Sequence, residues 1–173
     1  MATNLSFRKC DLSDLDELRE IAYTTFNDTF AQHNKPHNIE SYLAKAFNID
    51  QVRTELANPD SEFYFTHQEE ELVGYIKVNF APAQTDVNDP SSIELERIYV
   101  LSRFQSKGYG KEMMAMVLEL ARSRGMDYLW LGVWDQNVGA IRFYERNGFV
   151  KFDEHAFYLG DDLQTDYLMR LDL

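Results

Sequence analysis

The stretch Ile93–Lys111, IELERIYVLSRFQSKGYGK, decides how this chain folds. Its first part is rich in β-branched and aromatic residues, which favours a strand. A turn containing Gly108 and Gly110 follows, and an apolar run at helical spacing begins at Met113. A glycine turn between a strand and a helix directs free backbone N–H groups and the positive end of the helix at an anion. The sequence therefore predicts a phosphate-binding loop.

Two common phosphate-binding motifs do not fit this loop. A P-loop requires Ser or Thr after its GxxxxGK motif, whereas Lys111 is followed by an acidic residue. A dinucleotide fingerprint requires a third glycine at the position of Met113. What remains is the pattern Q-x-x-G-x-G over Gln105–Gly110. About one strand and one helix later the chain has Asn137 and then Tyr144-Glu-Arg-Asn-Gly-Phe149.

This combination resembles the GNAT superfamily of N-acetyltransferases, in which a [QR]-x-x-G-x-[GA] loop holds the pyrophosphate of acetyl-coenzyme A. Further segments look like the bacterial PaiA-type spermidine/spermine N-acetyltransferases. These segments are Phe26–Phe30, Glu94–Tyr99, Trp130–Trp134, His155–Gly160 and Gln164–Asp166. The resemblance extends over nearly the whole chain.

Length and pattern predict one domain over residues 1–173, long enough to bury a substantial core. The apolar periodicities give the order β-ααα-ββ-βα-βα-ββ around a single sheet. The expected strands are Leu5–Arg8, Glu62–His67, Leu72–Phe80, the one starting at Ile93, Tyr128–Val133, Phe149–Leu159 and Thr165–Leu171. The expected helices start at Ser13 (or Asp11) and at Asn38, and cover Asp50–Ala57, the run after Gly110 and Asn137–Asn147. The resemblance implies an α/β GNAT fold, a mixed and mostly antiparallel sheet of about seven strands flanked by helices.

Composition narrows the function classes. The formal net charge of −12 argues against a nucleic-acid partner, which needs a basic patch. The same charge would steer a cationic substrate inward, or it serves solubility alone. Apolar runs long enough for a membrane span or a signal peptide are not apparent. The single Cys10 excludes an internal disulfide and indicates a reducing, cytoplasmic location. It is better explained as buried than as an acyl carrier, and the histidines show no metal-ligand spacing.

Amide formation from a thioester needs a neutral amine, yet an alkyl amine is protonated at neutral pH, with a pKa of about 10.4. A general base would help. The first candidate is Glu96, near the position where the resemblance implies a carboxylate, and the second is Glu94, on the same nominal face of the strand. The structural alternative for Glu96 is a salt bridge with Arg97. A β-bulge, which the resemblance implies for this strand, would upset the assignment of faces.

Tyr144 matches the tyrosine that protonates the departing thiolate in many members of the superfamily. The structural alternative is a packed tyrosine on a helix stripe. Asn137 opens the same helix, so it is expected to cap that helix, to bind the pantetheine arm, or to do both. Arg142 and Arg146 are weaker candidates for the 3′-phosphate.

The remaining predicted contacts with acetyl-CoA lie in the quoted stretch. Ile98, Tyr99 and Val100 would act through their backbones, since pantetheine amides pair with a strand edge as a peptide does. The Val100 N–H would also stabilise charge on the carbonyl oxygen. The predicted loop contacts are Gln105, Ser106, Lys107, Gly108, Tyr109, Gly110 and Lys111. The predicted acceptor contacts are Asp28, Glu94, His155 and Tyr158.

The resemblance thus implies an acetyl-CoA-dependent N-acetyltransferase that acts on the primary amine of a small molecule, with a polyamine as the leading acceptor. No metal, nucleic acid or membrane partner is expected. Other acceptors remain open, namely a protein N-terminus, a lysine or another small amine, as does a non-catalytic regulator that binds acetyl-CoA. The oligomeric state is also left open, with a homodimer as one alternative.

Overall fold

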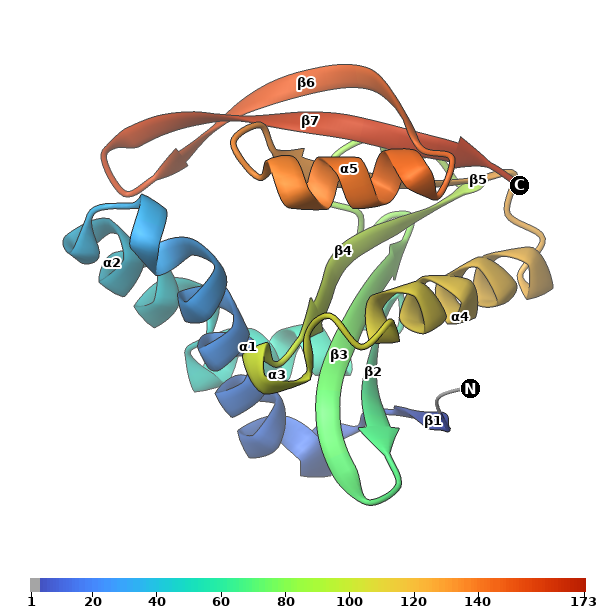
Figure 1. Cartoon of the computed structure of the whole chain (residues 1–173), viewed down its shortest axis with the longest axis horizontal. Coiled ribbons are helices and arrows are strands. Elements are labelled where there is room, and N and C mark those ends of the chain that lie inside the picture. The colour runs from blue at the N-terminus through green and yellow to red at the C-terminus, as the bar shows by residue number, and fades with distance from the viewer. Residues whose placement is uncertain (1–3) are drawn as a thin grey trace.

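The computed structural model describes residues 4–173, which form a seven-stranded sheet with helices on both faces (Figure 1). The strand order is β1-β2-β3-β4-β5-β7-β6. The strands are β1 (Leu5–Lys9), β2 (Ser61–Gln68), β3 (Glu71–Phe80), β4 (Ser92–Val100), β5 (Tyr128–Trp134), β6 (Val150–Leu159) and β7 (Asp162–Asp172). Every neighbouring pair is antiparallel except β4 with β5, which is parallel. The predicted fold class and order of elements are confirmed.

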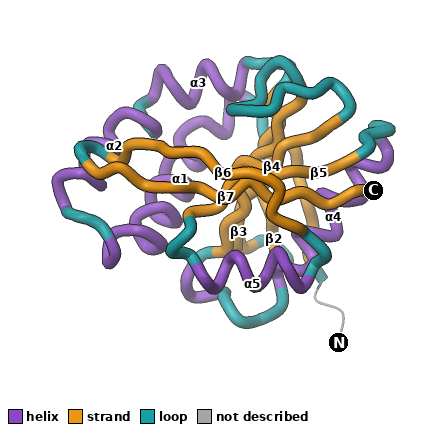
Figure 2. The backbone as a smooth tube through the Cα atoms, turned by 90° about the horizontal axis from the view of Figure 1, so that it is seen from above, coloured by secondary structure: helices purple, strands orange, loops and turns teal. Residues whose placement is uncertain are grey.

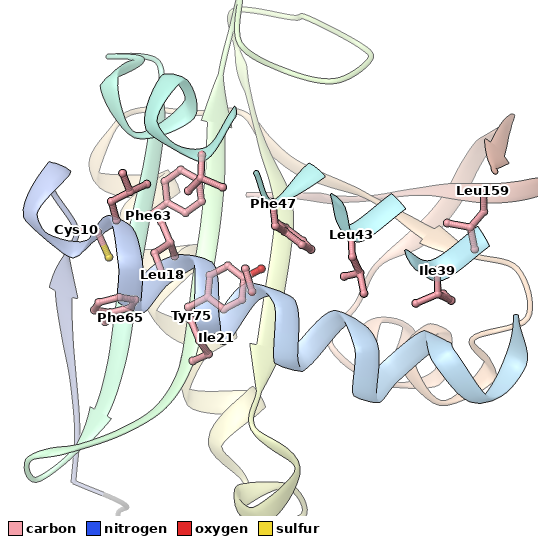
Figure 3. Close-up of a cluster of buried hydrophobic side chains, with 13 residues drawn as sticks. Cys10, Leu18, Ile21, Ile39, Leu43, Phe47, Phe63, Phe65, Tyr75 and Leu159 are labelled. Atoms are coloured by element: carbon pink, nitrogen blue, oxygen red, sulfur yellow. The ribbon is translucent and has the colours of Figure 1, made fainter. Parts of the chain in front are cut away.

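The helices divide between the two faces of the sheet (Figure 2). They are α1 (Leu15–Phe30), α2 (Pro36–Ala46), α3 (Ile49–Ala57), α4 (Tyr109–Ser123) and α5 (Val138–Arg146). Helices α1–α3 share one core with Phe63, Phe65 and Tyr75 of β2 and β3, which Figure 3 shows in close-up. Helices α4 and α5 pack on the opposite face, against alternate residues of β3 such as Ile76 and Val78. This alternation follows from the two-residue period of a strand.

Helix boundaries follow the local sequence closely. Helix α2 begins at Pro36 rather than at the predicted Asn38, because proline is well suited to the first helical turn. Asp11 caps the short 3-10 turn that leads into α1, and Asn137 caps α5 by accepting a hydrogen bond from the Ala140 N–H at 3.3 Å. The predicted Asn137–Asn147 helix therefore differs from α5 only by its two cap residues.

The sheet opens in its middle. Strands β4 and β5 pair only over their first residues, from Ser92 opposite Tyr128 to Glu94 opposite Trp130. Beyond Glu94, β4 pairs with β3 alone, while β5 continues along β7 as far as Trp134. The facing edges of β4 and β5 therefore diverge and leave unpaired backbone groups between them.

One residue disturbs the register on the other side of β4. Lys77 pairs with Arg97 and Val78 pairs with Leu95, so Glu96 is the extra residue of a β-bulge. The predicted complication from a bulge is therefore present. Even so, the carboxylates of Glu94 and Glu96 converge, because both accept hydrogen bonds from Asn79 Nδ2, at 2.9 and 2.8 Å.

The long β6–β7 hairpin reaches across the molecule, and its tip rests on α2 (Figures 1 and 2). Asn38 of α2 donates to Asp161 Oδ1 at 2.8 Å and accepts from the Asp161 N–H at 3.3 Å. Gly160 has a φ of +63°, and a Cβ there would clash with the Asn38 side chain. Leu159 inserts beside Ile39 of α2 (Figure 3). The hairpin tip is thus held by close packing and paired hydrogen bonds.

Candidate active site

The divergence of β4 and β5 opens into a cavity of about 1080 Å³. One end is lined by the glycine loop and the start of α4 and α5. The other end is lined by aromatic and acidic side chains from α1, α2 and β4–β7. We call these the donor end and the acceptor end. This volume lies at the upper end of the range for small-molecule sites, about 300–1,000 Å³.

The donor end is built on the N-terminus of α4. Gly108 is its N-cap residue with a φ of +86°, and Ser106 before it also has a positive φ, 64°. The amides of Tyr109 and Gly110 lie in the first turn and have no intrahelical acceptor. A Cβ added at Gly108 would meet no protein atom within 4 Å, so the space beside the loop is open. Open space, free amides and the positive helix end fit a pyrophosphate.

The loop side chains have unequal roles. Ser106, Lys111 and Gln105 line the cavity, and Gln105 donates to the Val100 carbonyl at 3.2 Å. Tyr109 also borders the cavity, but its ring is buried and its hydroxyl donates to Gln68.

Lys107 is a different case, because it is absent from the cavity lining and its ammonium lies 5.0 Å from the centroid of the Phe104 ring. The structure therefore brings the loop backbone and Lys111 to the donor end, and directs Lys107 elsewhere. Arg142 and Arg146 are exposed on α5, outside the cavity lining.

The open edge of β4 forms one wall. Ile98, Tyr99 and Val100 all line the cavity and lie beyond the last pairing with β5. The Tyr99 ring is turned away from this edge and stacks on Tyr75 at 5.9 Å between centroids. Backbone groups at these positions are therefore not paired with β5, and their use in binding pantetheine stays a prediction.

Tyr144 and Asn137, from α5, line the cavity near the loop. The Tyr144 ring packs against Phe143 and Phe149, with centroids 5.5 and 5.7 Å away. Burial raises the pKa of Tyr144 to about 12, so the hydroxyl stays protonated at neutral pH. A protonated hydroxyl on the cavity wall can donate a hydrogen bond, so the role of Tyr144 as a proton donor stays a prediction.

Glu96 sits in a cluster of compensated charge. Its carboxylate contacts the Lys77 ammonium and lies 3.5 Å from Arg97 Nη2. Glu55 of α3 pairs with the same two cations, at 3.0 and 3.4 Å. Burial would raise the pKa of Glu96, but Arg97, Lys77 and the hydrogen bond from Asn79 outweigh it and lower the pKa to about 2. The salt bridge with Arg97, the structural alternative, is present, and so low a pKa makes Glu96 a weak base.

Glu94 is buried and satisfied without a cation. It accepts hydrogen bonds from Asn79, from the Thr85 N–H at 2.8 Å and from the Thr85 hydroxyl. Burial raises the pKa of Glu94 against these hydrogen bonds. Its acceptor capacity is largely used, which leaves little room for a substrate amine.

The other predicted acceptor residues separate. Asp28 lies at the rim, exposed, and accepts a hydrogen bond from Ser102 at 2.7 Å. His155 lines the cavity and pairs with Asp86, its Nδ1 2.7 Å from Oδ2. Tyr158 is 69% exposed on β6 and does not line the cavity. Because both faces of β6 are largely exposed, its sequence does not indicate which of two neighbouring residues faces the cavity.

Two residues that the sequence did not single out, Asp166 and Trp134, also line the cavity. They face one another across β5 and β7, in register. Both lay inside segments quoted for the resemblance, but no local pattern marks a residue whose partner lies on another strand. The Asp166 carboxylate lies over Gly132, where a Cβ would come within 3.6 Å of Oδ2.

Three remaining predictions from the sequence concern Cys10, metal-binding clusters and membrane-spanning helices. Cys10 is buried in the α1–α3 core, and burial raises the pKa of its thiol to about 12. Within residues 4–173, no group of three or more His, Cys, Asp or Glu side chains is arranged to hold a metal ion. Over the same described range, no helix is both long and apolar enough to span a bilayer.

Comparison with known proteins agrees with this architecture. The family model of the Acetyltransferase (GNAT) family matches residues 15–149. An uncharacterized N-acetyltransferase in the pepI 3′ region of Lactobacillus delbrueckii subsp. lactis is 41% identical over 157 residues, 91% of each chain. The spermine/spermidine N(1)-acetyltransferase of Bacillus subtilis is 32% identical over 103 residues, 59% of this chain and 67% of that protein.

Among solved structures, the PaiA N-acetyltransferase of Thermoplasma acidophilum, in complex with coenzyme A, has a TM-score of 0.79 at 23% identity and covers all of both chains. That likeness shows the fold, and the family match and the Lactobacillus relative show the family. The chain therefore belongs to the GNAT family and is an acetyl-CoA-dependent N-acetyltransferase.

Proposed function

We propose that this enzyme acetylates a primary amine of a small di- or polycationic molecule, with a polyamine such as spermidine as the leading acceptor. The observation that carries the proposal is the acceptor end of the cavity, where carboxylates and aromatic rings converge. Phe26 stacks on Tyr42 with centroids 4.4 Å apart, and Phe30 lies 6.0 Å from Trp134. Aromatic faces and carboxylates are the groups that attract an ammonium.

The names of relatives support the acceptor class. The Bacillus subtilis relative is named a spermine/spermidine acetyltransferase, and a spermidine N(1)-acetyltransferase of Thermoplasma acidophilum is 24% identical over 150 residues. The net charge of −12 favours the approach of polycations at low ionic strength.

Acetyl-CoA supplies a thioester acetyl group, and residues at the donor end would hold it. The amides of Gly108, Tyr109 and Gly110 and the Lys111 side chain would bind the pyrophosphate. The edge of β4 from Ile98 to Val100 would pair with the pantetheine amides, with Asn137 on the other side. A backbone N–H at Val100 would stabilise the negative charge that develops on the carbonyl oxygen.

Tyr144 would donate a hydrogen bond to the departing sulfur. For free groups, proton transfer from a phenol of pKa about 10 to a thiolate, whose thiol has a pKa of about 8.5, is uphill. Burial raises the pKa of Tyr144 further, but desolvation raises the pKa of a buried thiol as well. The proton would therefore move only as the C–S bond breaks.

The experiment that tests the proposal measures thiol release from acetyl-CoA with a panel of amines. The panel contains spermidine, spermine, monoamines of matched length, free lysine, an aminoglycoside and a peptide with a free N-terminus. We expect the highest kcat/KM for the polyamines. A higher kcat/KM for the peptide would assign a protein acceptor, and equal rates for polyamine and monoamine would exclude the polyamine proposal. Binding of acetyl-CoA without turnover of any amine would indicate a regulator.

A further inference from the structure

We infer a further catalytic residue, Asp166, which binds the acceptor ammonium and takes its proton. His155 and Asp86 then pass that proton to solvent. This inference rests on the proposed transfer of acetyl to an amine. From the sequence, Glu96 is the first candidate base and Glu94 the second. The geometry of the three carboxylates points to Asp166 instead.

Position is the first argument. Asp166 lies on β7, in register with Trp134 of β5 on one side and with His155 of β6 on the other. Its carboxylate lies over Gly132, and all four of these residues line the cavity. The absence of a side chain at Gly132 leaves the carboxylate reachable from the space between β4 and β5.

Charge compensation is the second argument. Glu96 is already engaged by the cations Lys77 and Arg97, and Glu94 by neutral donors. Asp166 has no such set of partners among the described residues. A substrate ammonium therefore gains more from Asp166 than from a carboxylate whose charge is already neutralised.

The groups that face Asp166 come from four elements. They are His155 of β6, Asp135 after β5, Tyr42 of α2 and, through His155, Asp86 of the 81–91 loop. Burial raises the pKa of Asp166 to about 6, with a further rise from Asp135 and an opposing effect of His155. The carboxylate is thus mostly ionised at neutral pH, yet it is a stronger base than an exposed aspartate or Glu96.

His155 links this carboxylate to the outside. Its Nδ1 lies 2.7 Å from Asp86 Oδ2 and its Nε2 lies 3.8 Å from Asp166 Oδ2. In the neutral imidazole, Asp86 favours a proton on Nδ1, which leaves the Nε2 lone pair facing Asp166. Side-chain exposure rises along the chain, from 24% for Asp166 through 35% for His155 to 42% for Asp86. A shift of ~1 Å would bring Nε2 within hydrogen-bonding range of Oδ2.

The proton balance of the reaction closes with these groups. The ammonium gives one proton to the Asp166 carboxylate, and the free amine nitrogen attacks the thioester carbonyl carbon. The N–C bond forms and the C–S bond breaks, while the nitrogen loses a second proton as the sulfur gains one beside Tyr144. The products are an amide and a thiol. The proton on Asp166 leaves through His155, so one proton is released per turnover.

The test compares pH profiles of kcat/KM for spermidine. Asp166→Asn should lower kcat/KM about 100-fold near pH 7. The loss should shrink as the pH approaches the pKa of the substrate ammonium, about 10, because the free amine is then abundant without a base. In the wild type, kcat/KM should fall as the pH drops below the pKa of Asp166, about 6. Asp135→Asn is the matched control, because it removes a neighbouring carboxylate that does not line the cavity. It should keep kcat/KM near the wild-type value at pH 7 and shift only the acid limb of the profile to lower pH, because Asp135 raises the pKa of Asp166.

His155 has a separate signature. His155→Gln should lower kcat about tenfold, at the low end of acid–base effects, and leave KM for the amine almost unchanged, since it moves a proton without binding the amine. Asp166→Asn should raise KM as well as lower kcat. Asp166→Glu, which keeps the carboxylate, should recover part of the activity. Unchanged thermal stabilisation by acetyl-CoA shows that each variant is folded.

The outcomes separate the two proposals. Suppose that the wild type acetylates the amine. If Asp166→Asn then has the wild-type rate, or loses the same factor in kcat/KM at every pH, this inference is overturned and the proposed function stands. A wild type that binds acetyl-CoA but acetylates no amine overturns the proposed function, and this inference with it.

Discussion

The two ends of the cavity are built on different principles. The donor end comes from one continuous stretch, residues 98–111, with help from α5, and it presents mainly backbone groups. The acceptor end gathers side chains from α1, α2, the 81–91 loop and strands β4–β7, residues up to about 140 positions apart in the sequence. A backbone site depends on local conformation, whereas a side-chain site depends on register between distant strands. Variants at the two ends should therefore fail in different ways.

The largest effect is expected at the donor end. Gly108→Val places a β-branched side chain at a φ of +86° and fills the open space beside the free amides. Each charge-assisted hydrogen bond contributes about 1.5–3 kcal/mol. Losing one such bond should weaken acetyl-CoA binding about 10- to 100-fold, and losing two should weaken it further. Thermal stabilisation by acetyl-CoA measures the loss.

Gly125→Val is the matched control for this variant. Gly125 follows the other end of α4, has a φ of +68° and also has no protein atom within 4 Å of a built Cβ. Both variants should lose about 1–2 kcal/mol through the left-handed conformation. Only Gly108→Val should lose acetyl-CoA binding, and equal binding by the two variants would show that the loop is misassigned.

On the cavity wall formed by α5, Tyr144→Phe should lower kcat about 100-fold, because a proton donor at the sulfur is lost. The Kd for acetyl-CoA should barely change, since the ring and its packing remain. Steady-state kinetics and a binding titration measure the two quantities. Tyr109→Phe, which removes a hydroxyl bonded to Gln68 instead, should leave kcat unchanged. A wild-type kcat for Tyr144→Phe would leave this residue a packing role only.

At the acceptor end, Glu96→Gln should act mainly on stability. The pKa of Glu96 is depressed in the folded state, so its contribution is present above the unfolded pKa of about 4.3 and is lost as the pH falls towards 2. Removing one partner from a buried ion-pair cluster costs about 3 kcal/mol, or roughly 6–12 °C in Tm for a chain of this size. Thermal unfolding between pH 2 and 7 measures both the fall in Tm and its dependence on pH.

Two comparisons decide the interpretation of Glu96. The stability gap between wild type and Glu96→Gln should narrow from pH 5 to pH 2, whereas Asp50→Asn, in an exposed pair with Arg53, should show almost no gap. The rate of Glu96→Gln should fall by a similar factor at every pH. A rate loss confined to neutral pH would instead restore Glu96 as the base.

The smallest effect is expected at the rim. Asp28 is exposed and bonded to Ser102, so Asp28→Asn should reduce the preference for spermidine over a matched monoamine by less than about threefold. The preference itself should shrink as ionic strength rises, because exposed charges are screened. KM for acetyl-CoA should not change. A spermidine preference that is independent of salt would show that steering by surface charge is not its origin.

The difference between the two ends also explains what could be predicted from the sequence. The strand, glycine turn and helix of 93–111 form a local pattern, and the structure has these elements in that order, with Gly108, Gly110 and Val100 on the cavity. The environment of Glu96 could not be predicted, because Lys77 and Glu55 come from β3 and α3. Asp166 escaped notice for the same reason, since Gly132 and His155 that define its surroundings lie on other strands.

The hairpin tip on α2 has a consequence for how acceptor preference can diversify. Strands β6 and β7 carry His155 and Asp166, yet their far end is anchored by Asn38 against Gly160, outside the cavity lining. A substitution at that anchor would tilt a wall of the acceptor end while leaving the glycine loop undisturbed. A change at this distant contact would thus alter the range of acceptors without affecting the residues that hold acetyl-CoA.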